Sequence, residues 1–334
     1  MLEQYKQMTS QEYEKTTPLR VSYVKKAIVY PMENGLGTYD NSSHFGGVTY
    51  ADGSLVELSE TTRVSPPFMN LKFNRWYTGK NPIYPNDDVQ FVPEQVVFLG
   101  AFHQHYGHFI TESLARLWFM LSKNNKDYKC VYISQDNHCK YLDFLTLFGL
   151  DLDNLIRINS PTMFSSVIVP EPSIRLHDYY HRSYRETIDK IISSVSPMTY
   201  DKIYFSKAGV RNGRAIGESS IVNVFENNGY KIVASGSLSI LKTLQYLKGC
   251  KHFASTSATA SHNSIFAPCL SSCVCLNRSR HFHILQHFIS RMRCVHVTYV
   301  DVSLSSSLSS FGDAPCLLYP SRHLIRFFNC YKFS

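Results

Sequence analysis

The chain has 334 residues, of which 44% are hydrophobic and 18% charged, and its net charge is +8. This composition is that of a well-buried globular protein and excludes a disordered chain, and the length is enough for two domains. The positive charge favours an anionic partner, such as nucleotide phosphates, an acidic glycan or a membrane surface, but no nucleic acid is expected because no long Lys/Arg block and no standard nucleic-acid-binding motif occurs.

The first twenty residues are polar and lack the apolar core of a secretory signal. No run of about 18 apolar residues occurs, so no membrane span is expected. Nine cysteines without framework spacing fit a reducing compartment. These features predict a soluble, cytoplasmic protein. Peripheral contact with the inner face of a membrane stays open because residues 323–334 are basic and aromatic, although a docked terminal helix is favoured there.

Residues 21–90 carry turn signals between short extended stretches and predict a β-rich, irregular segment. From Gln95 onward, strand-like runs mostly alternate with helical stretches, and several runs are apolar throughout, as in parallel strands covered on both faces. This alternation predicts an α/β fold of βαβ units in doubly wound sheets. The runs are 96–99, 130–134, 167–170, 203–206, 231–234, 252–255, 273–276 and 295–300.

Several prolines and a polar helix around His181–Ser194 mark the middle of the chain. We therefore predict two Rossmann-like halves that face each other across a cleft, a usual place for small-molecule sites. The predicted boundaries are an N-terminal domain over 1–165, an interdomain region over 166–200, a C-terminal domain over 201–315 and a tail or helix over 316–334.

The first candidate for chemistry is the stretch Phe102–Trp118, which follows an apolar strand and is expected to enter a helix near Tyr106. A buried stripe at helical spacing comprises Ile110, Leu114, Leu117 and Leu121. His108, Glu112 and Arg116 fall on another face, each four residues from the next. A histidine with a carboxylate one turn away is a candidate general base, because the carboxylate fixes the tautomer and stabilises the imidazolium.

Two other interpretations of this stretch stay open. In the first interpretation, Glu112 and Arg116 form a surface ion pair. In the second, the protein is a metal-dependent hydrolase whose ligands are His103, His105, His108 and Glu112. Their spacing matches no standard motif, and a catalytic zinc needs three converging ligands.

The stretch Lys202–Glu218 predicts a buried strand, a basic loop with two glycines, and a helix start. In α/β proteins this order places backbone N–H groups and cations at the carboxyl edge of a sheet, where anions bind. Lys207, Arg211 and Arg214 would then neutralise a diphosphate. An ordinary solvated loop is the alternative.

A second loop, Ser255–Phe266, is small and hydroxyl-rich, which lets a ligand approach the backbone. Ser257 and Thr259 would cap a helix that faces a phosphate, although a capped helix without a ligand is the alternative. Both loops are expected at the same edge of one sheet, which favours the ligand. The cysteines and histidines of 269–287 suggest zinc, but no C-x-x-C pair occurs and buried cysteines that pack as small hydrophobes are commoner.

Taken in order, these segments resemble glycosyltransferase family 61, whose bacterial members build capsular and other surface polysaccharides. The resemblance covers roughly residues 95–300 and is carried by 106–118, 202–218, 229–233, 238–250 and 257–266. The positions that match the family pattern are His108, Glu112, Arg116, Arg211, Arg214, Glu218, His262 and Asn263.

The resemblance implies a GT-B fold with an acceptor-side N-terminal domain and a C-terminal nucleotide-sugar-binding domain. It also implies an inverting transfer of a hexosyl or pentosyl group to a glycan or lipid-linked acceptor, with no cofactor and no metal required. His108 oriented by Glu112, or Glu112 itself, would be the base, with His105 and Arg116 as further cleft candidates. The implied donor and diphosphate residues are Ser206, Lys207, Arg211, Arg214, Glu218, Ser257, Thr259, His262 and Asn263. A non-catalytic nucleotide- or glycan-binding module stays an alternative.

Four positions depart from the family pattern. Lys207 stands where an arginine is usual, and so loses bidentate phosphate geometry. Ser235-Gly236 replaces a frequent proline-glutamate, Thr243 stands near an expected glutamine, and residues 257–261 lack the common glycine. These departures leave the donor identity and full activity open.

Overall fold

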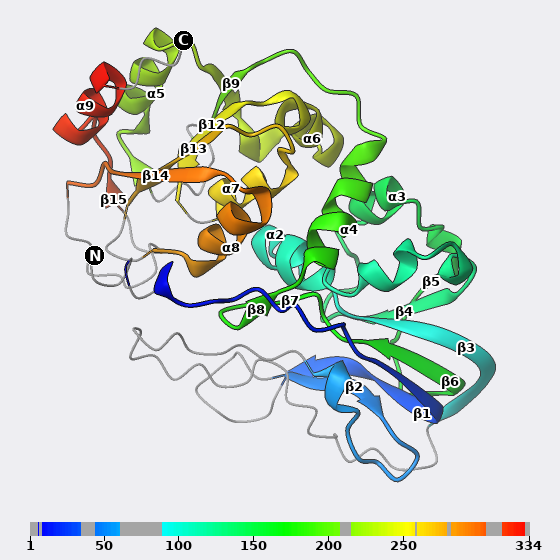
Figure 1. Cartoon of the computed structure of the whole chain (residues 1–334). Coiled ribbons are helices and arrows are strands. Elements are labelled where there is room, and N and C mark those ends of the chain that lie inside the picture. Colours follow the sequence, from blue (N-terminus) through cyan, green and yellow to red (C-terminus); the bar gives the residue numbers. More distant parts are fainter. Residues whose placement is uncertain are drawn as a thin grey trace. The chain divides into compact units, whose positions relative to one another are not determined.

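The computed structural model describes residues 6, 9–34, 44–60, 89–207, 215–257, 259–278, 282–304 and 316–330 (Figure 1). The chain divides into two compact units. The N-terminal unit is Tyr13–Ile191, and the C-terminal unit is Ile192–Ser334 together with Met1–Glu12.

The N-terminal unit is built on a six-stranded mixed sheet. In spatial order its strands are β2 (His44–Thr49), β1 (Val21–Asn34), β6 (Thr162–Pro170), β3 (Gln90–Ala101), β4 (Lys129–Ile133) and β5 (Leu155–Arg157). The last four are parallel, as predicted. Strand β1 is antiparallel to both β2 and β6, which differs from a doubly wound sheet. Only residues 35–43 join β1 to β2, too few for the crossover that parallel strands need.

Apolar side chains of these strands form the core of the unit, with Val29, Val96, Phe98, Val131 and Val167 all buried. Within the described residues, its α-helices are α2 (Tyr106–His108), α3 (Asp143–Phe148) and α4 (Arg182–Ser193), and a short hairpin joins β7 (Ile174–Arg175) to β8 (Tyr179–Tyr180). The polar helix predicted around 181–194 is therefore confirmed as α4.

The C-terminal unit contains a five-stranded parallel sheet (Figure 1). Its order is β11 (Lys231–Ala234), β9 (Lys202–Ser206), β12 (His252–Thr256), β13 (Ser272–Asn277) and β14 (His296–Asp301). Strand β9 comes first in the chain, β11 pairs on one side of it, and β12 and its successors extend the other side. The carboxyl ends of β9 and β12 therefore form the topological switch point, where doubly wound sheets bind their ligands.

The connections in this unit are mainly helical, as the alternating sequence pattern predicts. They include α5 (Glu218–Asn227), α6 (Ile240–Gly249), α7 (Thr259–His262) and α8 (Ile284–Arg293), and a small parallel pair joins β10 (Ala215–Ile216) to β15 (Cys316–Leu317). All eight predicted strand-like runs coincide with strands. Six agree within one residue at both ends, whereas β3 and β6 begin several residues earlier than predicted.

The C-terminal stretch forms α9 (Arg322–Cys330), in agreement with the docked helix favoured from the sequence. Leu324, Phe327 and Phe328 are buried, and the ring of Phe328 packs edge-on against Phe225 of α5. Among the described residues, no helix is both long and apolar enough to cross a lipid bilayer.

Candidate functional site

His108 and Glu112 form a close pair just beyond the carboxyl end of β3. The His108 Nδ1 atom lies 2.7 Å from the Glu112 Oε2 atom. The Glu112 side chain is 5% exposed, whereas that of His108 is 28% exposed. The structure therefore brings together the two residues that the sequence suggested, with a buried carboxylate against a histidine that solvent can reach. This arrangement suits a base whose imidazolium must be stabilised.

The segment that carries this pair is not the single α-helix expected from its periodicity. Three residues of α2 lead into a π-helical turn over Phe109–Ser113, and a 3₁₀ turn follows over Leu117–Leu121. The Thr111 hydroxyl donates to the carbonyl of Gly107 at 2.8 Å, and the Ser113 hydroxyl accepts from the backbone N–H of His103 at 3.0 Å. Ile110, Leu114 and Leu117 of the predicted stripe are fully buried.

Arg116 lies in the interior of the N-terminal unit, where it is only 2% exposed. Its Nε donates to the Pro170 carbonyl at 3.0 Å, and its Nη2 donates to the carbonyls of Leu58 at 2.7 Å and Glu60 at 3.3 Å. Burial lowers the pKa of this guanidinium to about 10. The alternative interpretation, a surface ion pair between Glu112 and Arg116, does not hold, because both side chains are buried.

Gly100 of β3 makes room for this arginine. Its φ is +93°, and a Cβ atom there would lie 2.6 Å from the Arg116 Nη1. The pairing of β3 with β4 shifts register at this point. A glycine is therefore required both by the backbone conformation and by the buried guanidinium.

The histidines of this stretch lie close to one another without forming a metal centre. The ring centroid of His108 lies 5.7 Å from that of His103 and 5.0 Å from that of His105. Nowhere in the described ranges are three or more His, Cys, Asp or Glu side chains placed to hold a metal ion. The ligand set of the hydrolase interpretation is therefore not assembled in this geometry.

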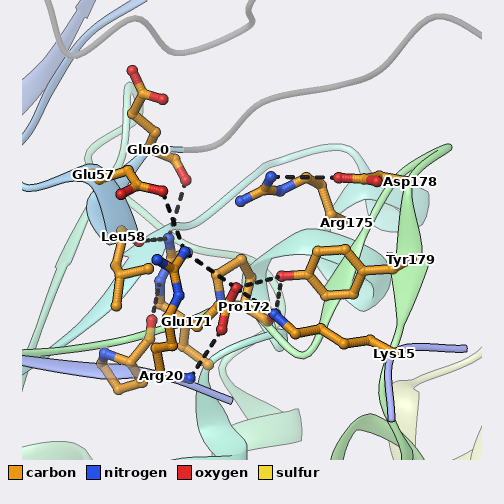
Figure 2. A network of polar contacts seen from close by, with 12 residues as sticks. Lys15, Arg20, Glu57, Leu58, Glu60, Glu171, Pro172, Arg175, Asp178 and Tyr179 are labelled. Carbon is orange, nitrogen blue, oxygen red and sulfur yellow. Dashed lines mark hydrogen bonds and ion pairs between the residues drawn. The ribbon is translucent and has the colours of Figure 1, made fainter. Parts of the chain in front are cut away.

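Glu171 anchors a polar network at the carboxyl end of β6 that the sequence reading missed (Figure 2). Its carboxylate lies 2.7 Å from Lys15 Nζ and accepts from the Arg20 backbone N–H at 2.9 Å. Burial raises the pKa of Glu171, but the hydrogen bonds and positive charges of Arg20 and Lys15 outweigh it and hold the pKa below its ordinary value. The sequence feature that could have indicated this network is a carboxylate directly after a buried strand.

Glu112 is one of the residues that line a small cavity in the same unit. Its other lining residues are Glu60, Ala115, Arg116, Pro172, Ile174, Arg175 and Leu176. Arg175 points toward Asp178, as Figure 2 shows, with Nη1 3.4 Å from the Asp178 Oδ2. This cavity has room for no more than about one water molecule, so it is too small for a substrate.

Lys207 follows β9 at the switch point of the C-terminal unit. Its backbone N–H donates to Glu218 Oε1 at 3.1 Å, and the Tyr204 hydroxyl donates to the same oxygen at 2.8 Å. Burial lowers the pKa of Lys207, the positive charge of Arg278 lowers it further, and Glu218 offsets part of this effect. Buried Glu218 therefore fixes the backbone of Lys207. Arg211 and Arg214 lie outside the described residues.

The second predicted loop reaches the same edge of the sheet, as expected. Phe205 pairs with Ser255, and the Ser257 backbone N–H donates to the Leu276 carbonyl at 2.9 Å, which places Ser257 level with Lys207. The helix that begins at Thr259 has only four residues, so its dipole is weak. His262 and Asn263 are buried beneath the loop.

Two of the residues that depart from the family pattern form hydrogen bonds within the protein. The Thr243 hydroxyl donates to the Ser239 carbonyl one turn earlier in α6, at 3.0 Å. The Ser235 hydroxyl donates to the carbonyl of buried Ser206 at 3.4 Å.

Arg278, directly after β13, is a cation of this edge that the sequence reading missed. The signal was present, because a basic residue following a buried apolar strand is what singled out Lys207. In the sequence, the surrounding cysteines and histidines raise zinc only as the less common alternative to buried cysteines, and no role is assigned to Arg278. Cys273 and Cys275 are fully buried in β13, where they pack as small hydrophobes.

Comparison with known proteins agrees with this distribution of residues. No curated protein matches the chain. The family model described as Glycosyltransferase 61 matches residues 106–275, half of the chain. The matched region contains the His108–Glu112 pair, Lys207 and the loop at Ser257–Asn263. The chain therefore belongs to glycosyltransferase family 61.

Proposed function

We propose that the protein is an inverting glycosyltransferase that moves a hexosyl or pentosyl group from a nucleotide-sugar to a glycan or lipid-linked acceptor in surface polysaccharide biosynthesis. The observation that supports this best is the 2.7 Å contact between His108 and Glu112 within the family-matched region. Inversion by a single displacement needs a base for the acceptor hydroxyl and no protein nucleophile.

In the proposed step, the acceptor oxygen attacks the anomeric carbon while the bond from that carbon to the diphosphate oxygen breaks. His108 takes the hydroxyl proton, and the buried carboxylate of Glu112 stabilises the resulting imidazolium. In an alternative form of this step, Glu112 itself is the base. His105 would contact the acceptor, whereas the three carbonyl partners of Arg116 favour a structural role.

We propose that the C-terminal unit binds the donor, as one half of a GT-B arrangement with the N-terminal unit on the acceptor side. Lys207 at the switch point, with Arg211 and Arg214, would stabilise the departing diphosphate, so the step requires no cofactor or metal. Glu218 would act by holding Lys207, since its Oε1 accepts from the Lys207 N–H. The other donor-side residues are Ser206, Ser257, Thr259, His262 and Asn263. A lipid-linked acceptor would place the reaction at the cytoplasmic face of a membrane.

The proposal is tested first by a thermal-shift screen against nucleotide-sugars. A ligand at 100 times its Kd stabilises the folded state by about 2.7 kcal/mol, which such a screen detects. With the donor known, NMR of the first-formed product gives the anomeric configuration. Inversion is expected, and retention would refute the mechanism.

The role of the base is tested with His108→Ala and Glu112→Gln. His108→Ala is expected to lower kcat by about 10²- to 10⁴-fold while leaving the donor Kd unchanged. Replacement of the exposed His138 by alanine is the matched control in the same unit. A donor that binds but is never transferred, with His108→Ala indistinguishable from wild type, would instead identify a non-catalytic binding module.

A further inference from the structure

Two cations lie at the carboxyl edge of the C-terminal sheet within the described residues. Pairing of Ser255 with Phe205 and of Thr256 with Leu276 places Lys207, Ser257 and Asn277 in one row across β9, β12 and β13. Arg278 is the next residue beyond this row. We infer that Arg278 binds the diphosphate of the donor together with Lys207, an inference that rests on the proposed function.

The charges around Lys207 support an anion between these residues. Arg278 and Glu218 both act electrostatically on Lys207, together with buried Cys316 of β15. The Cys316 thiol contributes no negative charge near neutrality, because burial raises its pKa. Within the described residues, Lys207 therefore interacts with one further cation and with the carboxylate of Glu218, which already accepts from Tyr204 and from the Lys207 backbone. The two neighbouring cations would attract a bound polyanion.

Arg278 also supplies a geometry that Lys207 lacks. A guanidinium presents a planar fork that binds two phosphate oxygens at once, whereas an ammonium is a point charge. Arg278 reaches the same edge from two strands away, so the bidentate contact is supplied from β13 in this chain.

The test measures binding of uridine, guanosine, adenosine and cytidine diphosphates by isothermal titration calorimetry. Arg278→Ala is expected to raise the Kd of the bound diphosphate by about ten- to a hundredfold, from the loss of charge-assisted hydrogen bonds. Arg278→Lys keeps the charge without the fork and is expected to fall between. The matched control is Arg291→Ala, an exposed arginine in the last turn of α8, next to the amino end of β14.

The outcomes separate this inference from the proposed function. If no diphosphate and no nucleotide-sugar binds the wild-type protein, both are overturned. If a diphosphate binds and Arg278→Ala leaves its Kd unchanged, or if Arg291→Ala weakens it equally, only the role of Arg278 is overturned. Thermal unfolding of each variant checks the fold, and Arg278→Lys decides the question if the alanine variant does not fold.

Discussion

The buried guanidinium of Arg116 leads to an unusual prediction: replacement by lysine should destabilise the N-terminal unit at least as much as replacement by methionine. Arg116 makes three hydrogen bonds to carbonyls of Leu58, Glu60 and Pro170. Hydrogen bonds from a charged group contribute roughly 1.5–3 kcal/mol each, and each carbonyl left without its donor costs about 1–3 kcal/mol. Methionine fills similar space and removes the desolvation cost of the charge, so a net loss of about 3 kcal/mol is expected.

Lysine keeps a cation in the same interior but cannot reach all three carbonyls. Its ammonium group retains the desolvation penalty and loses the fork that satisfies carbonyls from two separate segments. The burial that brings the pKa of Arg116 to about 10 would also favour the neutral form of a lysine there.

The assay is urea denaturation of the full chain, followed by the fluorescence of Trp118. The Trp118 indole donates to the Glu171 carbonyl at 2.8 Å and so reports on this region, and Trp76→Phe removes the second of the two tryptophans. With a slope of roughly 2 kcal/mol per molar urea, a loss of 3 kcal/mol lowers the midpoint by about 1.5 M. Arg182→Met, at an arginine 80% exposed, is the control and should change stability by less than about 0.5 kcal/mol. A lysine variant within 1 kcal/mol of wild type would refute the reasoning.

Three further predictions concern Gly100, Glu218 and three histidines. A residue with a Cβ atom in the left-handed conformation costs roughly 1 kcal/mol of stability. Gly100→Ala should destabilise the N-terminal unit by more than this, because the new Cβ atom would meet Arg116. The loss of stability should be smaller in an Arg116→Met background. Glu218→Gln should tighten diphosphate binding by about two- to fivefold in calorimetry, since one like charge is removed while the side-chain oxygen still accepts. The melting temperature should fall from pH 8 to pH 5.5, because burial lowers the pKa of three histidines. These histidines are His181, His252 and His287. Because folding favours their neutral form, the stability that they contribute is fully present above the ordinary pKa of about 6.5 and decreases as the pH drops below it.

The sequence predicted those features that depend on local pattern. Parallel strands buried on both faces leave short apolar runs, so the strands of the five-stranded sheet were visible without a structure. The pairing of His108 with Glu112 follows from their spacing of four residues. The partners of Arg116 could not be predicted, because two of them lie near residue 60 and one at the end of β6. The sequence shows that Arg116 lies four residues after Glu112. It does not show that carbonyls from distant parts of the chain bind the guanidinium instead.

Glu218, the first residue of α5, shows why a charged residue near a sheet edge does not by its position alone have a defined role. The family resemblance implied that Glu218 is one of the donor-binding residues, yet its Oε1 accepts from Tyr204 and from the Lys207 backbone. A carboxylate that bound ribose would make its replacement by glutamine weaken the donor complex. A carboxylate that only positions Lys207 opposes the incoming phosphates, so the same substitution should strengthen binding. The sign of one change in affinity therefore separates a ligand of the substrate from a support of the backbone.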